Sequence, residues 1–240
     1  MRKTLLIAVF LGLAALAVAC TTNENVKVEP SGQAQGISVS GTGQASGTPD
    51  LALLDLGVST EGKTVKEARD AAATAMNAVN NAVKGDGVAD KDVQTQQFSI
   101  EPEYQYPDGK QELVGFRVTN IVEVKVRNLD LTGQIIDDAA KAGGDVVQVQ
   151  GLTFTIEKPE TLRAQARQEA VADARTRAEG LADLAGVKLG KPISVSETTG
   201  TPPIPLRAAV PMTGGAESTT PIQAGELEVS VTVDVLYAIE

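Results

Sequence analysis

The sequence predicts an α+β protein in which helices pack on antiparallel sheets built from long hairpins, with the element order ββαββαβαββ. Runs of residues that alternate between apolar and polar recur along the chain, and this period of two is typical of strands buried on one face. Three other segments repeat apolar residues at every third or fourth position, which is typical of amphipathic helices. Clusters of glycine and proline separate these runs and indicate turns.

Two strands and a helix begin the ordered part of the chain. We expect strands over residues 37–43 and 51–60, because both runs alternate in polarity and turn-forming residues separate them. Thr64 fits the first position of a capping box, and the helix that it opens ends at Gly85. The apolar face of this helix consists of Val65, Ala68, Ala72, Met76, Val79 and Val83.

A long antiparallel hairpin follows the first helix. Residues 93–104 and 113–126 are rich in residue types that favour strands, and Pro107 and Gly109 lie in the turn between them. Proline presets the backbone angle φ that a turn needs, and glycine adopts positive φ without steric cost. The sequence therefore predicts two paired strands on either side of this turn.

The second half of the chain alternates between helices and strands. We expect a helix over residues 129–142, a strand over 146–156, a helix over 160–185, and strands over 191–198 and 227–239. The inner face of the longest helix is predicted to hold small residues, which let a helix lie close to a sheet. This predicted face consists of Ala164, Val171, Ala174, Ala178, Leu181 and Ala185.

Residues 199–225 are predicted to form a proline-rich loop. Five prolines and a Gly-Gly pair occur in this stretch, and proline cannot donate the backbone hydrogen bond that helices and sheets need. We expect no regular structure in the loop. It belongs to the single α+β domain expected over residues 36–240.

The N-terminal segment has the pattern of a bacterial lipoprotein signal peptide. Arg2 and Lys3 precede an apolar run, and small residues lead to Cys20, the single cysteine of the chain. We expect residues 1–19 to be removed and Cys20 to carry the lipid that attaches the protein to a membrane. Residues 20–35 are polar and aperiodic, so we expect them to be a flexible tether between the lipid and the fold.

Composition argues against several classes of function. The formal net charge of the chain is −10, and loss of Arg2 and Lys3 with the signal segment makes the mature protein still more acidic, which argues against nucleic-acid binding. The sequence contains no histidine, so histidine-dependent nucleophile arrangements and histidine-based metal sites are impossible. We predict no catalytic residue, no cofactor and no metal ligand.

Two segments approach ligand-binding motifs but lack the required context. Residues 41–47 are similar to a dinucleotide-binding pattern, yet Pro49 and a second strand follow where a helix should begin. A glycine-rich bend between strands is expected instead. Residues 86–92 hold three aspartates, but their spacing does not match a calcium-binding EF-hand loop, and a soluble turn is expected.

Two alternatives remain open for the long hairpin and the residues around it. The carboxylates in this region are Glu101, Glu103, Glu112 and Glu123, and the aromatic residues are Phe98, Tyr104, Tyr106 and Phe116. Converging carboxylates would favour a hydrolase that works without histidine. A concave patch of aromatic side chains would favour a binding module for a small envelope ligand or a cell-wall glycan. Packing in the core and at the hairpin tip explains the aromatic residues more simply.

Several segments also carry a family resemblance. They are residues 37–43 with Pro49-Asp50, residues 88–95, 115–120, 170–175 and 185–190. In their order and spacing they resemble the SIMPL-domain family of exported bacterial envelope proteins, and the resemblance runs over residues 37–236. It implies an α+β protein that assembles into ring-like or channel-like homo-oligomers and has loosely defined links to envelope or oxidative stress tolerance. It implies no catalytic residues.

The sequence thus predicts a non-enzymatic, lipid-anchored cell-envelope protein that acts through self-association or partner binding. Its expected partners are membrane lipids, through Cys20, and further copies of the same chain. Thr21 stands where an aspartate would retain a lipoprotein at the inner membrane. We therefore expect the outer membrane, facing the periplasm, in a bacterium with two membranes, and the outer face of the cell membrane otherwise.

Overall fold

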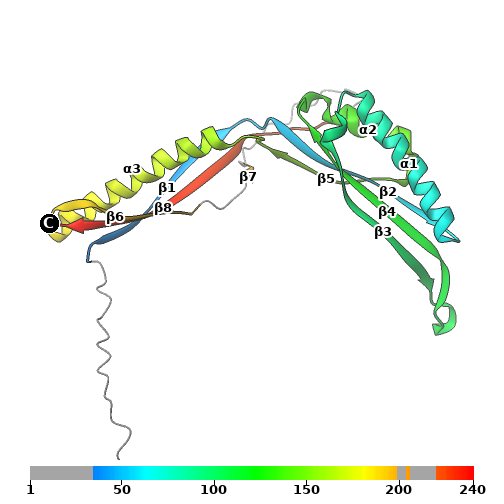
Figure 1. Ribbon diagram of the computed structural model, residues 1–240, viewed down its shortest axis with the longest axis horizontal. Coiled ribbons are helices and arrows are strands. Elements are labelled where there is room, and N and C mark those ends of the chain that lie inside the picture. The colour runs from blue at the N-terminus through cyan, green and yellow to red at the C-terminus, as the bar shows by residue number, and fades with distance from the viewer. Residues whose placement is uncertain (1–34, 199–203, 206–219) are drawn as a thin grey trace, which may run out of the picture. The chain divides into compact units, whose positions relative to one another are not determined.

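The computed structural model describes residues 35–198, 204–205 and 220–240, which form two antiparallel sheets with helices packed on them (Figure 1). The first sheet has the order β3-β4-β2-β5 and consists of β2 (Leu51–Gly62), β3 (Val93–Gln105), β4 (Glu112–Val126) and β5 (Val147–Thr155). The second has the order β1-β8-β6 and consists of β1 (Ile37–Gly47), β6 (Leu189–Thr198) and β8 (Leu227–Ile239), with β7 (Ile204–Pro205) also paired to β8. The predicted α+β class is confirmed.

Helices α1 (Val65–Gly85) and α2 (Thr132–Gly143) pack on one face of the first sheet. Alternate residues of the central strands point toward these helices, among them Leu54 and Leu56 of β2 and Val124 of β4, and all three are fully buried. Val79 and Val83 of α1 meet them from the other side. The apolar alternation of the sequence therefore becomes the larger of the two cores.

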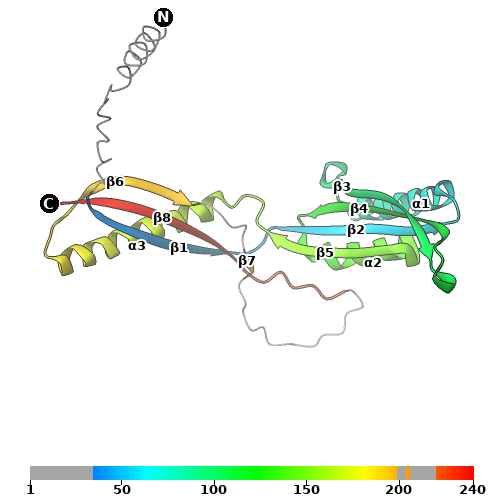
Figure 2. The ribbon, with the colours of Figure 1, turned by 90° about the horizontal axis from the view of Figure 1, so that it is seen from below.

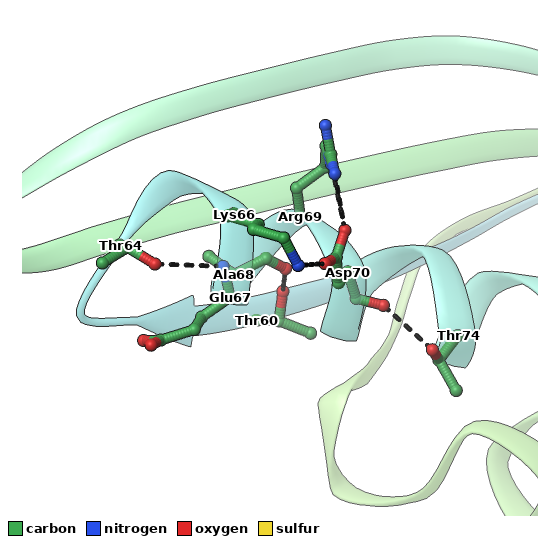
Figure 3. A network of polar contacts seen from close by, with 8 residues as sticks. All are labelled: Thr60, Thr64, Lys66, Glu67, Ala68, Arg69, Asp70 and Thr74. Carbon is green, nitrogen blue, oxygen red and sulfur yellow. Dashed lines mark hydrogen bonds and ion pairs between the residues drawn. The ribbon is translucent and has the colours of Figure 1, made fainter.

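The N-terminus of α1 has the predicted cap (Figure 3). Thr64 accepts a hydrogen bond from the backbone N–H of Glu67 at 3.2 Å, which satisfies one of the free donors of the first turn. The buried Thr60 of β2 donates its hydroxyl to the carbonyl oxygen of Ala68 at 2.7 Å and ties the helix start to the sheet.

Helix α3 (Glu160–Ala185) lies directly against the backbone of β1. A Cβ atom placed on Gly41 would be 2.2 Å from the carbonyl oxygen of Ala170, and one on Gly43 would be 2.0 Å from that of Ala166. No side chain fits at either glycine. The expectation of a glycine-rich bend over residues 41–47 is therefore wrong, because these residues belong to β1. The missing side chains of Gly41 and Gly43 let α3 lie close to the strand.

The buried face of α3 is a row of alanines at every fourth position, Ala166, Ala170, Ala174, Ala178 and Ala182. Four helical residues rise about 6.0 Å and two strand residues about 6.6–6.8 Å, so successive alanines follow the two-residue repeat of β1. The predicted face is right at Ala174 and Ala178. It is wrong at the other four positions, which are exposed. Val171 and Leu181 are too large for a contact that has room only for methyl groups, and Ala164 and Ala185 lie outside the row of every fourth residue.

Other differences from the predicted elements are small. β7 pairs with β8 at Glu228 and Leu227, so the expectation that residues 199–225 lack regular structure is wrong over two residues, since an edge position tolerates proline. α2 begins at Thr132 after a 3₁₀ turn, Leu129–Leu131. The predicted signal peptide, its Cys20 and nearly all of the tether lie outside the described residues.

Replacement of Ala174 by leucine tests the close contact between α3 and β1. Overpacking of this kind typically costs about 1–3 kcal/mol. In a domain of this size each kcal/mol lowers the thermal midpoint by about 2–4 °C. Ala172→Leu is the control, because Ala172 is exposed on the same helix. Equal thermal midpoints for both variants, measured by circular dichroism, would contradict the contact.

Candidate functional site

Strand β3 forms one edge of the first sheet and pairs with β4 over its whole length, from Val93 opposite Val124 to Gln105 opposite Glu112. The two strands form the predicted antiparallel hairpin, which Figure 1 shows as the pair labelled β3 and β4. In the part of the chain that the structure describes, no strand covers the other side of β3. Its outer backbone groups are therefore available for pairing.

Phe98 and Ile100 of β3 are apolar side chains on an exposed strand. They lie opposite Asn120 and Val118 of β4, so they belong to the same face of the sheet as the core. Helix α1 packs mainly on β2 and β4, however, and leaves this part of β3 uncovered. Phe98 is consequently 54% exposed.

The end of the hairpin carries further exposed apolar groups. Tyr104 lies opposite Leu113, and Tyr106 precedes the turn and is 66% exposed. In the turn, Asp108 has φ of 50° and Gly109 has φ of 78°, so the second positive φ was predicted and the first was not. We define the hairpin surface as Phe98, Ile100, Tyr104, Tyr106, Leu113 and Val114.

The length of the hairpin explains this exposure. A helix of 21 residues such as α1 spans about 32 Å, whereas a strand of 15 residues such as β4 spans about 50 Å. One helix cannot cover the whole hairpin. Comparison of the two lengths is a signal present in the sequence, and it would have identified Ile100, Leu113 and Val114 as candidates.

The four aromatic residues do not gather in one hollow. Phe116 is half-buried and packs against the core, as predicted, whereas the packing expected for Phe98, Tyr104 and Tyr106 is wrong because these side chains are exposed. A hollow of about 500 Å³ lies beside the hairpin, and of the four aromatic residues it includes Tyr104 alone among its lining residues. This geometry does not favour a stacking platform for sugars.

The four carboxylates do not form one group, because Glu101 and Glu103 line the hollow beside the hairpin whereas Glu112 and Glu123 are not among its lining residues. Glu112 and Glu123 both belong to β4 and lie eleven residues apart, about 36 Å along an extended strand. Glu103 pairs with Arg117, which also binds Glu61 at 2.7 Å. A pair of carboxylates flanking one bond would need a separation of about 5–10 Å. The described residues hold no cluster of three or more side chains suited to a metal ion.

A second group of charges is centred on Arg127 at the end of β4. Its guanidinium contacts the buried Asp92 at 2.8 Å and binds both carboxylate oxygens of Glu157, at 2.6 and 3.0 Å. The backbone N–H of Glu157 donates to Asp50 at 2.7 Å. The network thus links the two segments in which the chain passes from one sheet to the other, since Asp50 lies between β1 and β2 and Glu157 between β5 and α3. The hydrogen bond from Arg127 lowers the pKa of Asp92 and also that of Glu157, so both remain ionised as structural partners.

The pKa of Asp86, at the C-terminus of α1, shifts in the opposite direction to that of Asp92. Burial, followed by the nearby charge of Asp138, raises its pKa. Asp86 and Asp92 both line a hollow of about 400 Å³. Two carboxyl groups whose pKa values shift in opposite directions resemble the acid and base of an active site. Yet one oxygen of Asp86 accepts from Gln134 at 3.1 Å and the other is buried, so neither is presented to a substrate.

The two sheets (Figure 2) and the hairpin surface define an α+β protein with no evident reaction centre among its described residues. The chain belongs to the SIMPL family, described as proteins of unknown function (DUF541), whose model matches residues 37–237. This confirms the family resemblance of the segments named above.

Named relatives are similar in sequence to most of the chain. The chain is 36% identical over 214 residues to the 26 kDa periplasmic immunogenic protein of Brucella melitensis, a match that covers 85% of this chain and 84% of that protein. It is 32% identical over 160 residues to the uncharacterized protein YggE of Edwardsiella ictaluri, covering 66% of each. For YggE of Escherichia coli K12 the identity is 30% over 159 residues, covering 66% of this chain and 64% of that protein.

The pKa of Asp86 predicts a dependence of stability on pH. The proton on Asp86 contributes stability that is complete below its ordinary pKa of 3.8 and is lost as pH rises through the raised value. Asp138→Asn removes the neighbouring charge. We expect this variant to raise the thermal midpoint at pH 7 on the order of 1–2 °C, as about 0.5 kcal/mol would, and to have no effect near pH 3.

Asp108→Asn is the control for the pH experiment, because Asp108 lies in the exposed hairpin turn. Thermal midpoints of the wild type and both variants, measured between pH 3 and pH 8, give the comparison. A difference between wild type and Asp138→Asn that stays constant over this range would contradict the assignment.

Proposed function

We propose that this protein is a lipid-anchored envelope protein that works without enzymatic chemistry, by self-association through the hairpin surface. The observation that carries the proposal is the presence of six exposed apolar side chains along one edge strand and the adjoining hairpin end. Exposed apolar patches of this kind are typical of protein interaction sites, and a free edge strand adds backbone hydrogen bonds to them.

The energetics support a specific interface. Burying one large apolar side chain contributes about 1.5–3 kcal/mol, so the six residues of the hairpin surface contribute at most about 9–18 kcal/mol if all are buried, against a cost of association of about 4–15 kcal/mol. Acidic charge elsewhere on the chain keeps non-specific aggregation low. The interface therefore has to bury most of the hairpin surface, because two or three of its residues alone do not offset the cost of association.

Location and attachment are proposed on separate grounds. The relatives from Brucella are named as periplasmic, which supports an exported envelope protein. The signal pattern that ends at Cys20 supports attachment through a lipid, and Thr21 supports the outer membrane. In the described part of the chain no helix is long and apolar enough to cross a membrane. A link to stress tolerance is proposed only from the family resemblance.

A binding module for a small envelope ligand is the alternative. A hollow of about 460 Å³ lies between the start of α2 and the segment that precedes β8, and its size is that of many ligand sites. Thr220 of this segment is held on α2 by Asp137, which accepts from its backbone N–H at 3.1 Å and from its hydroxyl at 2.7 Å. Leu129, Phe154 and Ile222 line the hollow. A hydrolase is the less favoured third possibility.

Removal of apolar groups from the hairpin surface tests the proposal. We expect Phe98→Ser combined with Leu113→Ser to weaken self-association at least tenfold, since each tenfold step corresponds to about 1.4 kcal/mol. Sedimentation of the mature chain in density-matched detergent measures the association constant.

Two exposed apolar residues elsewhere provide the matched control. Val171→Ser combined with Ile193→Ser removes similar side chains from α3 and β6. Equal association of both double variants would exclude the hairpin surface. A wild-type protein that stays monomeric at high micromolar concentration would exclude self-association and favour the binding module.

Replacement of Cys20 by serine tests the lipid anchor. Because only a cysteine at this position can be acylated, the variant should leave the membrane fraction or keep its signal segment. Fractionation of cells and mass measurement of the protein distinguish these results. The anchor would be refuted by a variant that stays in the membrane with the wild-type mature mass.

A further inference from the structure

The edge of β1 that faces away from β8 is met by side chains of α3. The backbone N–H of Thr42 donates to Asp173 Oδ2 at 2.9 Å, and that of Gln44 donates to Glu169 Oε2 at 3.2 Å. Both N–H groups point away from β8, because only alternate residues of an antiparallel strand bond to a given partner and these two bond to α3 instead. Two carboxylates therefore accept the hydrogen bonds that a neighbouring strand would otherwise accept.

The spacing of these contacts follows from the close packing of helix and strand. Glu169 and Asp173 are one turn apart, about 6.0 Å along the helix, and Gln44 and Thr42 are two residues apart, about 6.6–6.8 Å along the strand. Each carboxylate precedes an alanine of the buried row by one residue. The packed row of alanines thus places Asp173 level with the Thr42 amide and Glu169 level with the Gln44 amide.

The next turn of α3 carries no acceptor. Arg177 occupies the equivalent position, and its guanidinium is paired with Asp173 at 2.9 and 3.0 Å. Beyond it, a hollow of about 490 Å³ is lined by Val39, Ser40, Arg177, Gly180, Leu181 and Leu184. Two of these, Leu181 and Leu184, are exposed apolar residues. The carboxylate cover therefore spans Thr42 and Gln44 and ends before Ser40.

We propose that Glu169 and Asp173 block strand addition at β1, each carboxylate standing where a carbonyl oxygen of an incoming strand would lie. The strand that they exclude is β1 of a second copy, because two identical edges are self-complementary when they run antiparallel. The contact is autoinhibitory. It leaves β3, an edge strand of the other sheet, open to pairing, and it does not depend on the role of the hairpin surface.

The electrostatics of Asp173 suit this role. The hydrogen bond from the Thr42 N–H, followed by that from Arg177, lowers the pKa of its carboxyl group, so the acceptor stays ionised at neutral and mildly acidic pH. Charged acceptors also make stronger hydrogen bonds than neutral ones. An incoming strand would have to displace both carboxylates before pairing.

Amide hydrogen exchange in the wild-type mature chain, in detergent, gives a test that needs no variant. The amides of Thr42 and Gln44 should exchange at least tenfold more slowly than those of Ser38 and Ser40, although all four lie on the same edge. Equal exchange rates for the four amides would overturn the proposal, whether or not the chain self-associates through the hairpin.

A double variant tests the block directly. Glu169→Ala combined with Asp173→Ala should remove the protection of Thr42 and Gln44 and strengthen self-association at least tenfold, with new protection of Ser40 in the associated form. Glu169→Gln combined with Asp173→Asn keeps an acceptor oxygen at each position and should remain close to wild type. This pair separates hydrogen bonding from charge.

The control variant removes the same charge from the same helix. Glu179 pairs with Arg175 and Asp183 is exposed near the C-terminus of α3, so Glu179→Ala combined with Asp183→Ala should leave exchange at β1 unchanged. Wild-type association of the Glu169 and Asp173 alanine variant would refute the block. Should that variant fail to fold, the exchange rates of the wild type still decide the question.

Discussion

The contact between the bare backbone of β1 and the alanine row of α3 determines how the second sheet is built. Because Gly41 and Gly43 have no side chains, the helix axis can lie close to the strand, and only methyl groups fit between them. At that distance the neighbouring side chains of α3 extend past the strand edge. The valines of β8 then complete the smaller of the two cores. A larger residue at either glycine would move the helix and every contact that follows from it.

Much of the fold could be predicted because local patterns and tertiary packing agree. The cap at Thr64, the helix end at Gly85 and the turn after Tyr106 are each determined by a few adjacent residues. The structure places each of them within one or two positions of the predicted one. The inner face of α3 was mispredicted at Val171 and Leu181. Periodicity ranks residues by apolarity, whereas the strand beneath the helix selects them by size.

The candidate site shows the limits of the sequence in another way. Asp86 and Asp92 lie six residues apart in one loop, yet their pKa values shift in opposite directions. The causes are distant in the chain, since Arg127 lies 35 residues beyond Asp92. Exposure of Phe98 likewise depends on which strands α1 covers. Residue types identified the hairpin as unusual, but only the packing distinguishes its buried side chains from its exposed ones.

The position of β8 affects how the protein folds during its synthesis. The last strand of the chain is the central strand of the second sheet, and it lies between β1, which is made first, and β6. Ser40 of β1 meets Asp234 of β8 across 194 residues. Contacts of such high sequence separation form slowly. Since a chain emerges from its N-terminus, β1 has no ladder partner in this sheet until β6 and β8 have been synthesised, and α3, which precedes both in the sequence, can pack on β1 before then.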